Sequence, residues 1–242
     1  MKAEEEVKDI FSHLKRLIRA HQEMGLEPPP IPAGSLPDLV VSSTQAGAGD
    51  LSSLKTVREH IGECRRCKLE KGRKHLVFGE GSPNSRLVFV GEGPGREEDL
   101  VGKPFVGEAG KLLTKIIKAM GLTREEVYIC NVVKCRPPGN RDPERDEIEA
   151  CLPFLKQQLN IIRPDVICVL GRIAAQNLLR MDFKITRERG TWHSYMDIPV
   201  MPTYHPAYIV RNKHRERELK GQVWVDIKKI MTHLGLEVKK YA

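Results

Sequence analysis

The chain has 242 residues, and its 40 lysines and arginines against 32 aspartates and glutamates give a formal net charge of +8 at pH 7. Its longest apolar runs are strand-sized, well short of the ~20 residues that a membrane-spanning helix needs, and its charged N-terminus does not resemble a signal peptide. We therefore expect a cytoplasmic protein without a membrane partner. The positive charge favours a polyanionic partner such as nucleic acid. In a protein that is not secreted, six cysteines favour metal ligation over disulfides.

The N-terminal part differs in composition from the rest. Residues 1–24 predict an amphipathic helix, whose apolar face would carry Ile10, Phe11, Leu14, Leu17 and Ile18. Residues 25–50 are rich in Pro, Gly and Ser, which is typical of a linker. The helix would either pack on the domain formed by residues 51–242 or dock a protein partner, and both alternatives stay open.

From residue 51 onward, apolar β-rich runs alternate with helical segments. The predicted strands are 87–90, 127–133, 166–170 and 200–204, and the predicted helices are 109–120, 144–160 and 172–180. Continuous apolar strands that alternate with helices are typical of a parallel sheet covered on both faces, so we predict an α/β fold. In open sheets of this class, ligands bind at the carboxyl ends of the strands.

Polar motifs directly follow three of these strands. They are Gly91-Glu92-Gly93, Asn131 and His205-Pro206, and the fold therefore brings them to one edge of the sheet. The glycines let the backbone approach a ligand closely. Phe105, in a loop flanked by Pro and Gly, is either a core residue or a stacking platform for a planar ring.

Asn131 and His205 each have a structural and a functional interpretation. The Asn131 amide either ties loops together or reads a base, because an amide pairs with a neighbouring donor and acceptor at once. Uracil presents O4 as acceptor and N3–H as donor, whereas cytosine presents the opposite pair, so one fixed amide would accept uracil and reject cytosine. His205 is either a loop residue or a group aimed at developing negative charge, with Arg211 and the basic run after it gripping phosphates.

Four cysteines have a spacing that suits metal ligands: Cys64, Cys67, Cys135 and Cys151. Four thiolates suit either a structural zinc or a four-iron cluster. Zinc is the second choice, because the second short Cys-x-x-Cys knuckle is missing. The remaining Cys130 and Cys168 fall inside apolar strands and are predicted core residues. The loop from Arg136 to Arg141 has the charge and stiffness to hold a DNA backbone near the metal.

The segment from about residue 52 to 235 resembles the family 4 uracil-DNA glycosylases, the iron–sulfur type. The resemblance rests on the four-cysteine spacing and on five motifs: Gly91-Glu-Gly-Pro-Gly-x-x-Glu-Asp99, Lys103-Pro-Phe-Val-Gly107, Asn131-Val-Val-Lys-Cys-Arg-Pro-Pro138, Arg189-Gly-Thr-Trp192 and His205-Pro-Ala-Tyr208. Ile209-Val210 stands where the family usually has Leu-Leu, so the residue that wedges into the DNA stack is not assigned. The histidine-bearing insert of a sister group that captures uracil covalently is absent from the interval 136–150.

This resemblance implies a three-layer α/β/α sandwich on a four-stranded parallel sheet. It implies a monofunctional hydrolase, acting as a monomer, that excises uracil from single- or double-stranded DNA and leaves an abasic site for base excision repair. Glu92 would position or activate the attacking water, and His205 would stabilise charge on uracil O2. In the substrate pocket beside Gly91 and Gly93, Glu98 would lie against uracil C5, Phe105 would stack on the base and Asn131 would read its edge.

The resemblance also implies a structural [4Fe–4S] cluster on Cys64, Cys67, Cys135 and Cys151. Lys103 and Lys134 would have a flipped base or a phosphate as neighbour, and neither is expected to be a desolvated nucleophile. Two rival functions remain: a non-catalytic metal-containing module that binds nucleic acid, and a relative that excises other deaminated bases.

Overall fold

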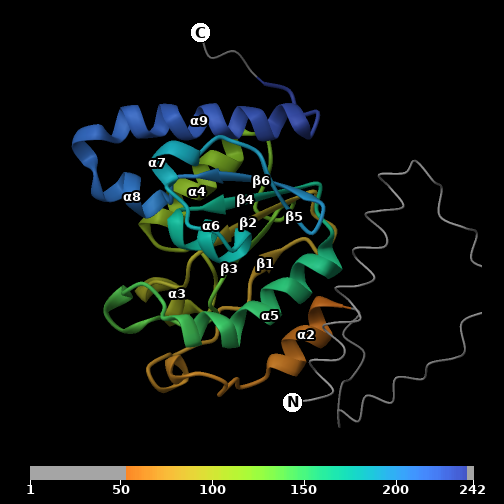
Figure 1. The fold of residues 1–242 in the computed structure, drawn as a ribbon, viewed down its shortest axis with the longest axis vertical. Helices are drawn as coiled ribbons and strands as arrows, with labels where there is room; N and C mark the ends of the chain where they lie inside the picture. The colour runs from red at the N-terminus through yellow and green to blue at the C-terminus, as the bar shows by residue number, and fades with distance from the viewer. Residues whose placement is uncertain (1–52, 239–242) are drawn as a thin grey trace, which may run out of the picture. The chain divides into compact units, whose positions relative to one another are not determined.

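The computed structural model describes residues 53–238, which fold around one β-sheet. The helix predicted within residues 1–24 and the linker predicted for 25–50 lie outside the described residues. Within them the sheet has six strands, in the order β1-β3-β2-β4-β6-β5 (Figure 1). Their bounds are β1 (Glu80–Gly81), β2 (Leu87–Gly91), β3 (Tyr128–Asn131), β4 (Val166–Leu170), β5 (His193–Tyr195) and β6 (Ile198–Thr203).

The central strands correspond to the four that the sequence predicts. β2 pairs in parallel with β3 and β4, and β4 pairs in parallel with β6. At the two edges β1 and β5 add antiparallel pairs, so the sheet has six strands rather than the expected four. The edge strands are only two and three residues long and their side chains are not fully buried, so they lack the apolar run by which a strand is recognised in a sequence.

The predicted helices correspond to α4 (Glu108–Ala119), α5 (Arg145–Ile162) and α6 (Arg172–Leu179), with ends displaced by at most two residues. The other helices are α2 (Leu54–Ile61), α3 (Arg96–Val101), α7 (Ile185–Glu188), α8 (Pro206–Arg211) and α9 (Glu216–His233). Three short 3-10 turns are η1 (Lys68–Lys71), η2 (Pro138–Asn140) and η3 (Lys213–Arg215). Among the described residues no helix is both long and apolar enough to cross a membrane.

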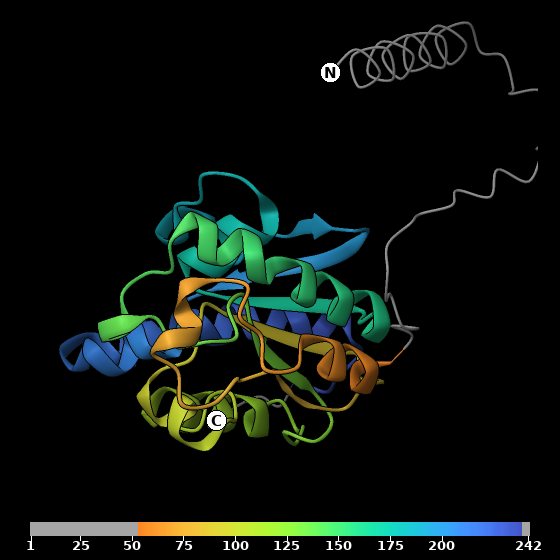
Figure 2. The same ribbon diagram turned by 90° about the horizontal axis from the view of Figure 1, so that it is seen from below.

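Helices cover both faces of the sheet, because the buried strand side chains alternate between two cores. Leu87 and Phe89 of β2 pack in the core formed with α4, α8 and α9. Val88 and Val90, one position along, pack in the core formed with α5 and α6. Figures 1 and 2 show the result, with α9 along one side of the sheet and α5 along the other. The described domain is therefore a three-layer α/β/α structure.

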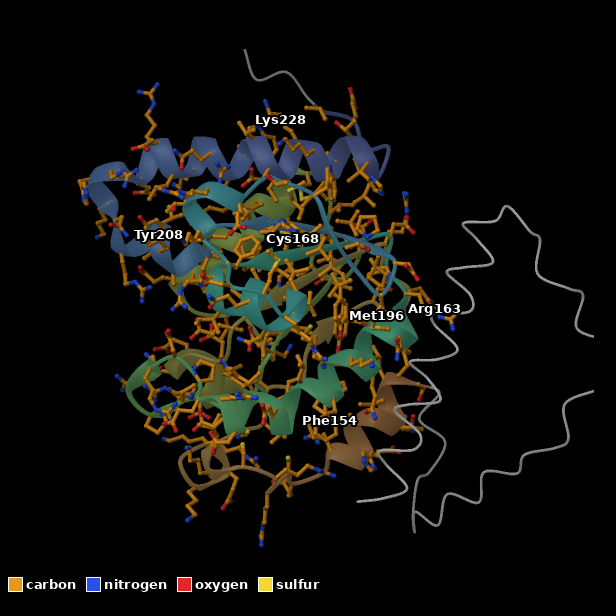
Figure 3. All side chains as sticks on the ribbon, in the orientation of Figure 1. Phe154, Arg163, Cys168, Met196, Tyr208 and Lys228 are labelled. Atoms are coloured by element: carbon orange, nitrogen blue, oxygen red, sulfur yellow. The ribbon has the colours of Figure 1, made fainter. Side chains whose placement is uncertain are left out.

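Two further predictions concern residues inside these layers. Cys130 and Cys168 are fully buried in β3 and β4, as expected of core residues, and Figure 3 shows Cys168 within the sheet. On the outside of α5, Phe154 packs against Val57 and Ile61 of α2, and this small third core attaches α2 to the domain. The segment carrying Cys64 and Cys67 follows α2 directly, so this contact positions the first cysteine pair.

Candidate active site

A cavity of about 460 Å³ opens at the carboxyl ends of the parallel strands. It lies where the polar motifs follow β2, β3 and β6, at the sheet edge that the sequence predicts. The predicted site residues that line it are Glu92, Gly93, Glu98, Phe105, Asn131, Arg141, His205 and Arg211. Further lining residues, for which the sequence predicted no role in the site, include Asp142, Arg172, Tyr204 and Tyr208.

Gly91, which is not itself among the lining residues, lies against two residues that are, Asn131 and Phe105. It pairs in register with Asn131 across β2 and β3. A Cβ atom on Gly91 would lie 2.4 Å from Asn131 Oδ1 and 2.6 Å from Phe105 Cζ, so a side chain here would displace both. A Cβ on Gly93 would similarly lie 2.7 Å from Val133 Cγ2. The missing side chains of the two glycines thus leave space for neighbouring protein groups, which shape the cavity.

The Asn131 side chain is buried with an unused acceptor. It is 1% exposed, and its Oδ1 atom has no hydrogen-bond partner within the described part of the chain. A buried polar atom left unpaired costs free energy of about 1–3 kcal/mol, so such atoms are rare unless a ligand or water satisfies them. Asn131 also lines the cavity, and its Oδ1 atom lies beside Gly91 and the Phe105 ring.

Phe105 is held in an unusual backbone conformation beside this amide. Its φ of +52° lies in the left-handed region, which non-glycine residues rarely adopt. In the backbone that follows Phe105, the N–H groups of Val106 and Gly107 donate hydrogen bonds to Glu98 Oε1, at 2.8 Å and 2.9 Å. The ring lies 5.5 Å from the His205 ring, with 31° between their planes. One edge of the cavity is therefore an aromatic pair.

Glu92 follows β2 and lies half-buried in the cavity wall. Burial raises its pKa to about 7, and the negative charge of Asp142 adds to this, while Arg172 and Arg211 oppose it. Arg172 Nη2 also donates to Asp142 Oδ2 at 2.9 Å. Asp142 and Arg172 are not among the residues predicted from the sequence, although Gly171-Arg172 follows β4 just as the other motifs follow their strands.

His205 caps α8 and is held in one tautomer by that role. Its Nδ1 atom accepts a hydrogen bond from the backbone N–H of Ala207 at 3.1 Å, so Nδ1 carries no proton and Nε2 does. Burial lowers the pKa of His205 to about 4, with a further contribution from Arg211. At neutral pH His205 is therefore an uncharged imidazole with an N–H donor at Nε2.

The strand before His205 is anchored by the Arg189 motif. Asp226 of α9, 1% exposed, pairs with Arg189 Nη2 at 2.6 Å and accepts from Thr203 Oγ1 at 2.6 Å. The Arg189 guanidinium also stacks 5.2 Å above the centroid of the Tyr204 ring. These contacts hold the end of β6, two residues before His205.

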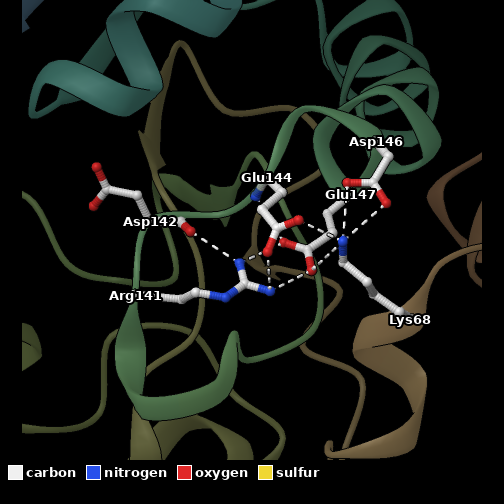
Figure 4. Close-up of polar contacts among 6 residues, drawn as sticks. All are labelled: Lys68, Arg141, Asp142, Glu144, Asp146 and Glu147. Atoms are coloured by element: carbon white, nitrogen blue, oxygen red, sulfur yellow. Dashed lines mark hydrogen bonds and ion pairs between the residues drawn. The ribbon is translucent and has the colours of Figure 1, made fainter.

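The three arginines predicted to bind DNA have different surroundings. Arg141 is bound on both terminal nitrogens to the buried Glu147, at 2.8 and 2.6 Å, and also pairs with Glu144 at 3.1 Å (Figure 4). These contacts favour a structural role for Arg141 over the predicted phosphate contact. Arg136 is half-buried and donates to Asn140 at 2.7 Å, whereas Arg211 is exposed at the cavity mouth.

The two lysines considered as nucleophiles are both engaged elsewhere. Lys103 is exposed and pairs with Glu80 at 2.8 Å. Lys134 is fully buried, and its Nζ donates to the backbone oxygen of Asn131 and to Gln158. The expectation of a base or phosphate neighbour is therefore wrong for Lys134, and so is the expectation that it is not desolvated, because burial lowers its pKa.

The four candidate ligand cysteines come from three segments that the fold brings together. Cys64 and Cys67 follow α2, Cys135 follows β3, and Cys151 lies in α5. Burial raises the pKa of Cys135, and the neighbouring thiols of Cys67 and Cys64 raise it further. Burial likewise raises the pKa of Cys151 to about 12, with contributions from Cys135 and Cys67 that Lys134 opposes. The four sulfurs are thus near enough to influence one another.

The sulfur atoms also accept hydrogen bonds, as thiolate ligands do. Arg66 donates to Cys64 Sγ at 3.5 Å, Arg73 donates to Cys135 Sγ at 3.3 Å, and the backbone N–H of Lys134 donates to Cys151 Sγ at 3.2 Å. Within residues 53–238, no three His, Cys, Asp or Glu side chains are arranged to hold a single metal ion. The donor set is nevertheless all sulfur, which fits an iron–sulfur group.

Known proteins are similar to this chain over the segment that carries these residues. The model of the uracil DNA glycosylase superfamily matches residues 78–228. A type-4 uracil-DNA glycosylase from Thermotoga maritima is 46% identical over 186 residues, which cover 76% of this chain and 96% of that protein. The type-4 enzymes from Saccharolobus solfataricus and Archaeoglobus fulgidus are 48% and 45% identical, over 67% and 74% of this chain and 79% and 92% of their own lengths. The chain therefore belongs to the uracil DNA glycosylase superfamily, and within it to the type-4 uracil-DNA glycosylases.

Proposed function

We propose that this protein is a DNA repair hydrolase that breaks the N-glycosidic bond of uracil in DNA and leaves an abasic site for base excision repair. The observation that carries the proposal is the buried Asn131 amide: the residue lines the cavity, and its unpaired Oδ1 lies beside Gly91 and the Phe105 ring. A cavity of about 460 Å³ is large enough for a flipped nucleotide. Family membership supports the same activity.

Recognition would combine stacking with an amide pair. Phe105 stacks on the flipped base, while Asn131 Oδ1 accepts from uracil N3–H and its amide N–H donates to O4. Cytosine offers the reverse pattern and would leave the buried amide unpaired, which is the basis of its rejection. Glu98, whose Oε1 is already bound to the Phe105 loop, lies on the side proposed to face uracil C5 and would exclude the thymine methyl.

In bond cleavage, His205 would act on the negative charge that develops on uracil, and Glu92 would act at the sugar, which becomes positive. As the bond from C1′ to N1 breaks, its electron pair leaves with uracil, and negative charge develops on O2. The neutral His205 donates its Nε2–H to this oxygen. The sugar gains positive character, and a water held by the Glu92 carboxylate adds to C1′ while Glu92 accepts its proton. No amine from the protein is needed, so the DNA strand stays intact.

We further propose that Cys64, Cys67, Cys135 and Cys151 hold a [4Fe–4S] cluster, with zinc as the rival. When bound, the cluster would supply a structural cross-link and no step of the hydrolysis. Purified protein should be brown, with absorption near ~400 nm and about four irons per chain. One zinc and no iron per chain would overturn this assignment.

The DNA would be single- or double-stranded and would contact Arg211 at the cavity mouth and Arg136 in the loop after β3. Residues 51–242 would form the complete catalytic domain of a monomer, with residues 25–50 as a linker. Residues 1–24 would be either a surface helix or a docking helix for another protein. A chain lacking residues 1–50 should then retain full excision of uracil from an oligonucleotide.

The decisive experiment incubates purified protein, in EDTA, with oligonucleotides that differ at one position: uracil, hypoxanthine, thymine or cytosine. Alkali should then cleave only the uracil strand, and borohydride should trap no protein–DNA adduct. Glu92→Gln should lose activity, whereas Glu97→Gln, an exposed neighbour in α3, should keep it. Binding without excision would favour the nucleic-acid-binding module, and equal excision of hypoxanthine would favour the broader deaminated-base enzyme.

A further inference from the structure

Phe105 lies in a loop whose backbone is held from both sides. Its left-handed conformation is costly for a residue with a side chain and persists only where the surroundings impose it. Glu98 binds the N–H groups that follow Phe105. The carbonyl groups on the other side are bound by a residue that the proposed mechanism does not use, Arg124.

Arg124 reaches this loop from the segment between α4 and β3. Its Nη2 donates to the carbonyl oxygen of Pro104 at 2.8 Å, and its Nη1 donates to the carbonyl oxygen of Phe105 at 3.1 Å. Nη1 also donates to Thr114 Oγ1 at 3.2 Å. One planar guanidinium therefore binds two consecutive carbonyl groups and the helix beneath them, which the single ammonium of a lysine does not do in a fixed geometry.

The guanidinium is itself held in place by a carboxylate on the edge of the sheet. Glu80 of β1 accepts from Arg124 Nη2 at 3.2 Å and from Lys103 Nζ at 2.8 Å. The Arg124 side chain is only 19% exposed, so water competes little for its donors. β1 therefore connects the edge of the sheet to the Phe105 loop.

The Phe105 carbonyl also packs closely against α4. A Cβ atom on Gly110 of α4 would lie 1.9 Å from this oxygen, so the backbone of α4 directly abuts the peptide after Phe105. With α4 on one side and Arg124 on the other, the peptide plane is fixed. The direction of the Phe105 side chain, 5.5 Å from His205 and against Gly91, follows from it.

We propose that Arg124 is a positioning residue for uracil recognition: together with Glu80 it clamps the two carbonyl groups around Phe105 and so holds the stacking platform in the cavity. The proposal rests on the proposed function, because it takes Phe105 as the surface on which the base stacks. Arg124 acts only through Phe105. Its loss should therefore weaken binding of the base rather than change the chemistry of bond cleavage.

A double-mutant cycle tests this on the full-length protein. Arg124→Gln should lower kcat/KM for a uracil oligonucleotide on the order of tenfold and weaken inhibition by free uracil, with Arg124→Lys in between. In a Phe105→Ala background the same substitution should change kcat/KM by less than about twofold. Arg86→Gln, which breaks the exposed pair with Asp165, is the matched control and should change nothing.

The possible outcomes distinguish failure of the Arg124 clamp from failure of the stacking role of Phe105. Equal losses from Arg124→Gln in both backgrounds, or no loss in the natural background, would overturn the clamp. If Phe105→Ala itself left excision unchanged, the stacking role in the proposed function would fail instead. Measuring Tm for every variant, and assaying well below the lowest Tm, excludes unfolding as the cause of any loss.

Discussion

Lys134 Nζ lies 2.8 Å from the backbone carbonyl oxygen of Asn131, entirely inside the protein. The same nitrogen donates to Gln158 Oε1 at 2.6 Å, and Gln158 in turn donates to Tyr128 and to the Phe78 carbonyl. The backbone N–H of Lys134 donates to Cys151. A single buried residue thus connects the backbone of Asn131 to Cys151.

Replacing Lys134 with Met should destabilise the protein and slow uracil excision. Met fills a similar volume but leaves Asn131 O and Gln158 Oε1 without their donor, at a cost of about 1–3 kcal/mol for each unpaired group. Lys156→Met, at an exposed position of the same helix as Gln158, is the control. Urea denaturation gives the free energy of unfolding, and equal values for both variants would contradict the structural role of Lys134.

Strand ends are where reasoning from the sequence succeeds. Each parallel strand is an apolar run buried on both faces, and a polar motif marks its end, so the position of the cavity and several of its lining residues could be predicted from order alone. The same reasoning would have found Arg172 after β4. It could not find β1 and β5, whose pairing depends on neighbouring strands rather than on their own residues.

The partners of charged side chains are harder to predict from the sequence. Arg141 lies in a basic loop that is predicted to contact DNA, and the sequence gives no sign that its side chain pairs with Glu147, six residues on and buried at the start of α5. From the sequence, Lys134 is expected to be a solvated cation, but in the structure it is fully buried. Such pairings depend on the three-dimensional proximity of segments, which charge and spacing along the chain do not encode.

The Asn131→Asp substitution should reduce uracil excision by at least ~10²-fold, because losing a buried pairing costs on the order of 2–4 kcal/mol. The new carboxylate would face uracil O4, an acceptor, in place of the amide donor. Single-turnover rates on a uracil oligonucleotide measure the effect. Asn177→Asp, at a half-buried position in α6, serves as the control. Unchanged turnover would return Asn131 to a purely structural role.

The pH dependence of excision should report Glu92. Its pKa of about 7 means that the carboxylate form, which is proposed to hold the water, disappears as the pH falls below 7. We expect kcat/KM to fall with a midpoint near that value. His205, with a pKa of about 4, stays neutral over this range and should add no second transition. A His205→Asn variant should therefore keep the midpoint while losing rate, and a midpoint that moved with His205 would contradict the assignment to Glu92.

The same group has an opposite effect on stability. Folding raises the pKa of Glu92 from 4.5 to about 7, so the folded protein binds the proton more tightly than the unfolded chain does. The stability of the fold therefore decreases as the pH rises from 4.5 to about 7. Glu92→Gln, which has no charge to bury, should raise Tm at pH 8 more than at pH 4.5. A Tm gain that did not depend on pH would argue against a perturbed carboxyl group.

Arg211→Ala and Arg141→Ala should differ in what they change. Arg211 is exposed at the cavity mouth, so its loss should weaken DNA binding and reduce the slope of log Kd against log salt by about one unit.

Arg141 instead neutralises the buried Glu147, together with Lys68 in the ion-pair group of Figure 4. Removing one partner of a buried pair leaves an uncompensated charge, so Arg141→Ala should lower Tm while leaving the salt slope nearly unchanged. Fluorescence anisotropy across a salt series, paired with thermal unfolding, measures both quantities. A reduced salt slope with an unchanged Tm for Arg141→Ala would restore Arg141 as a phosphate contact.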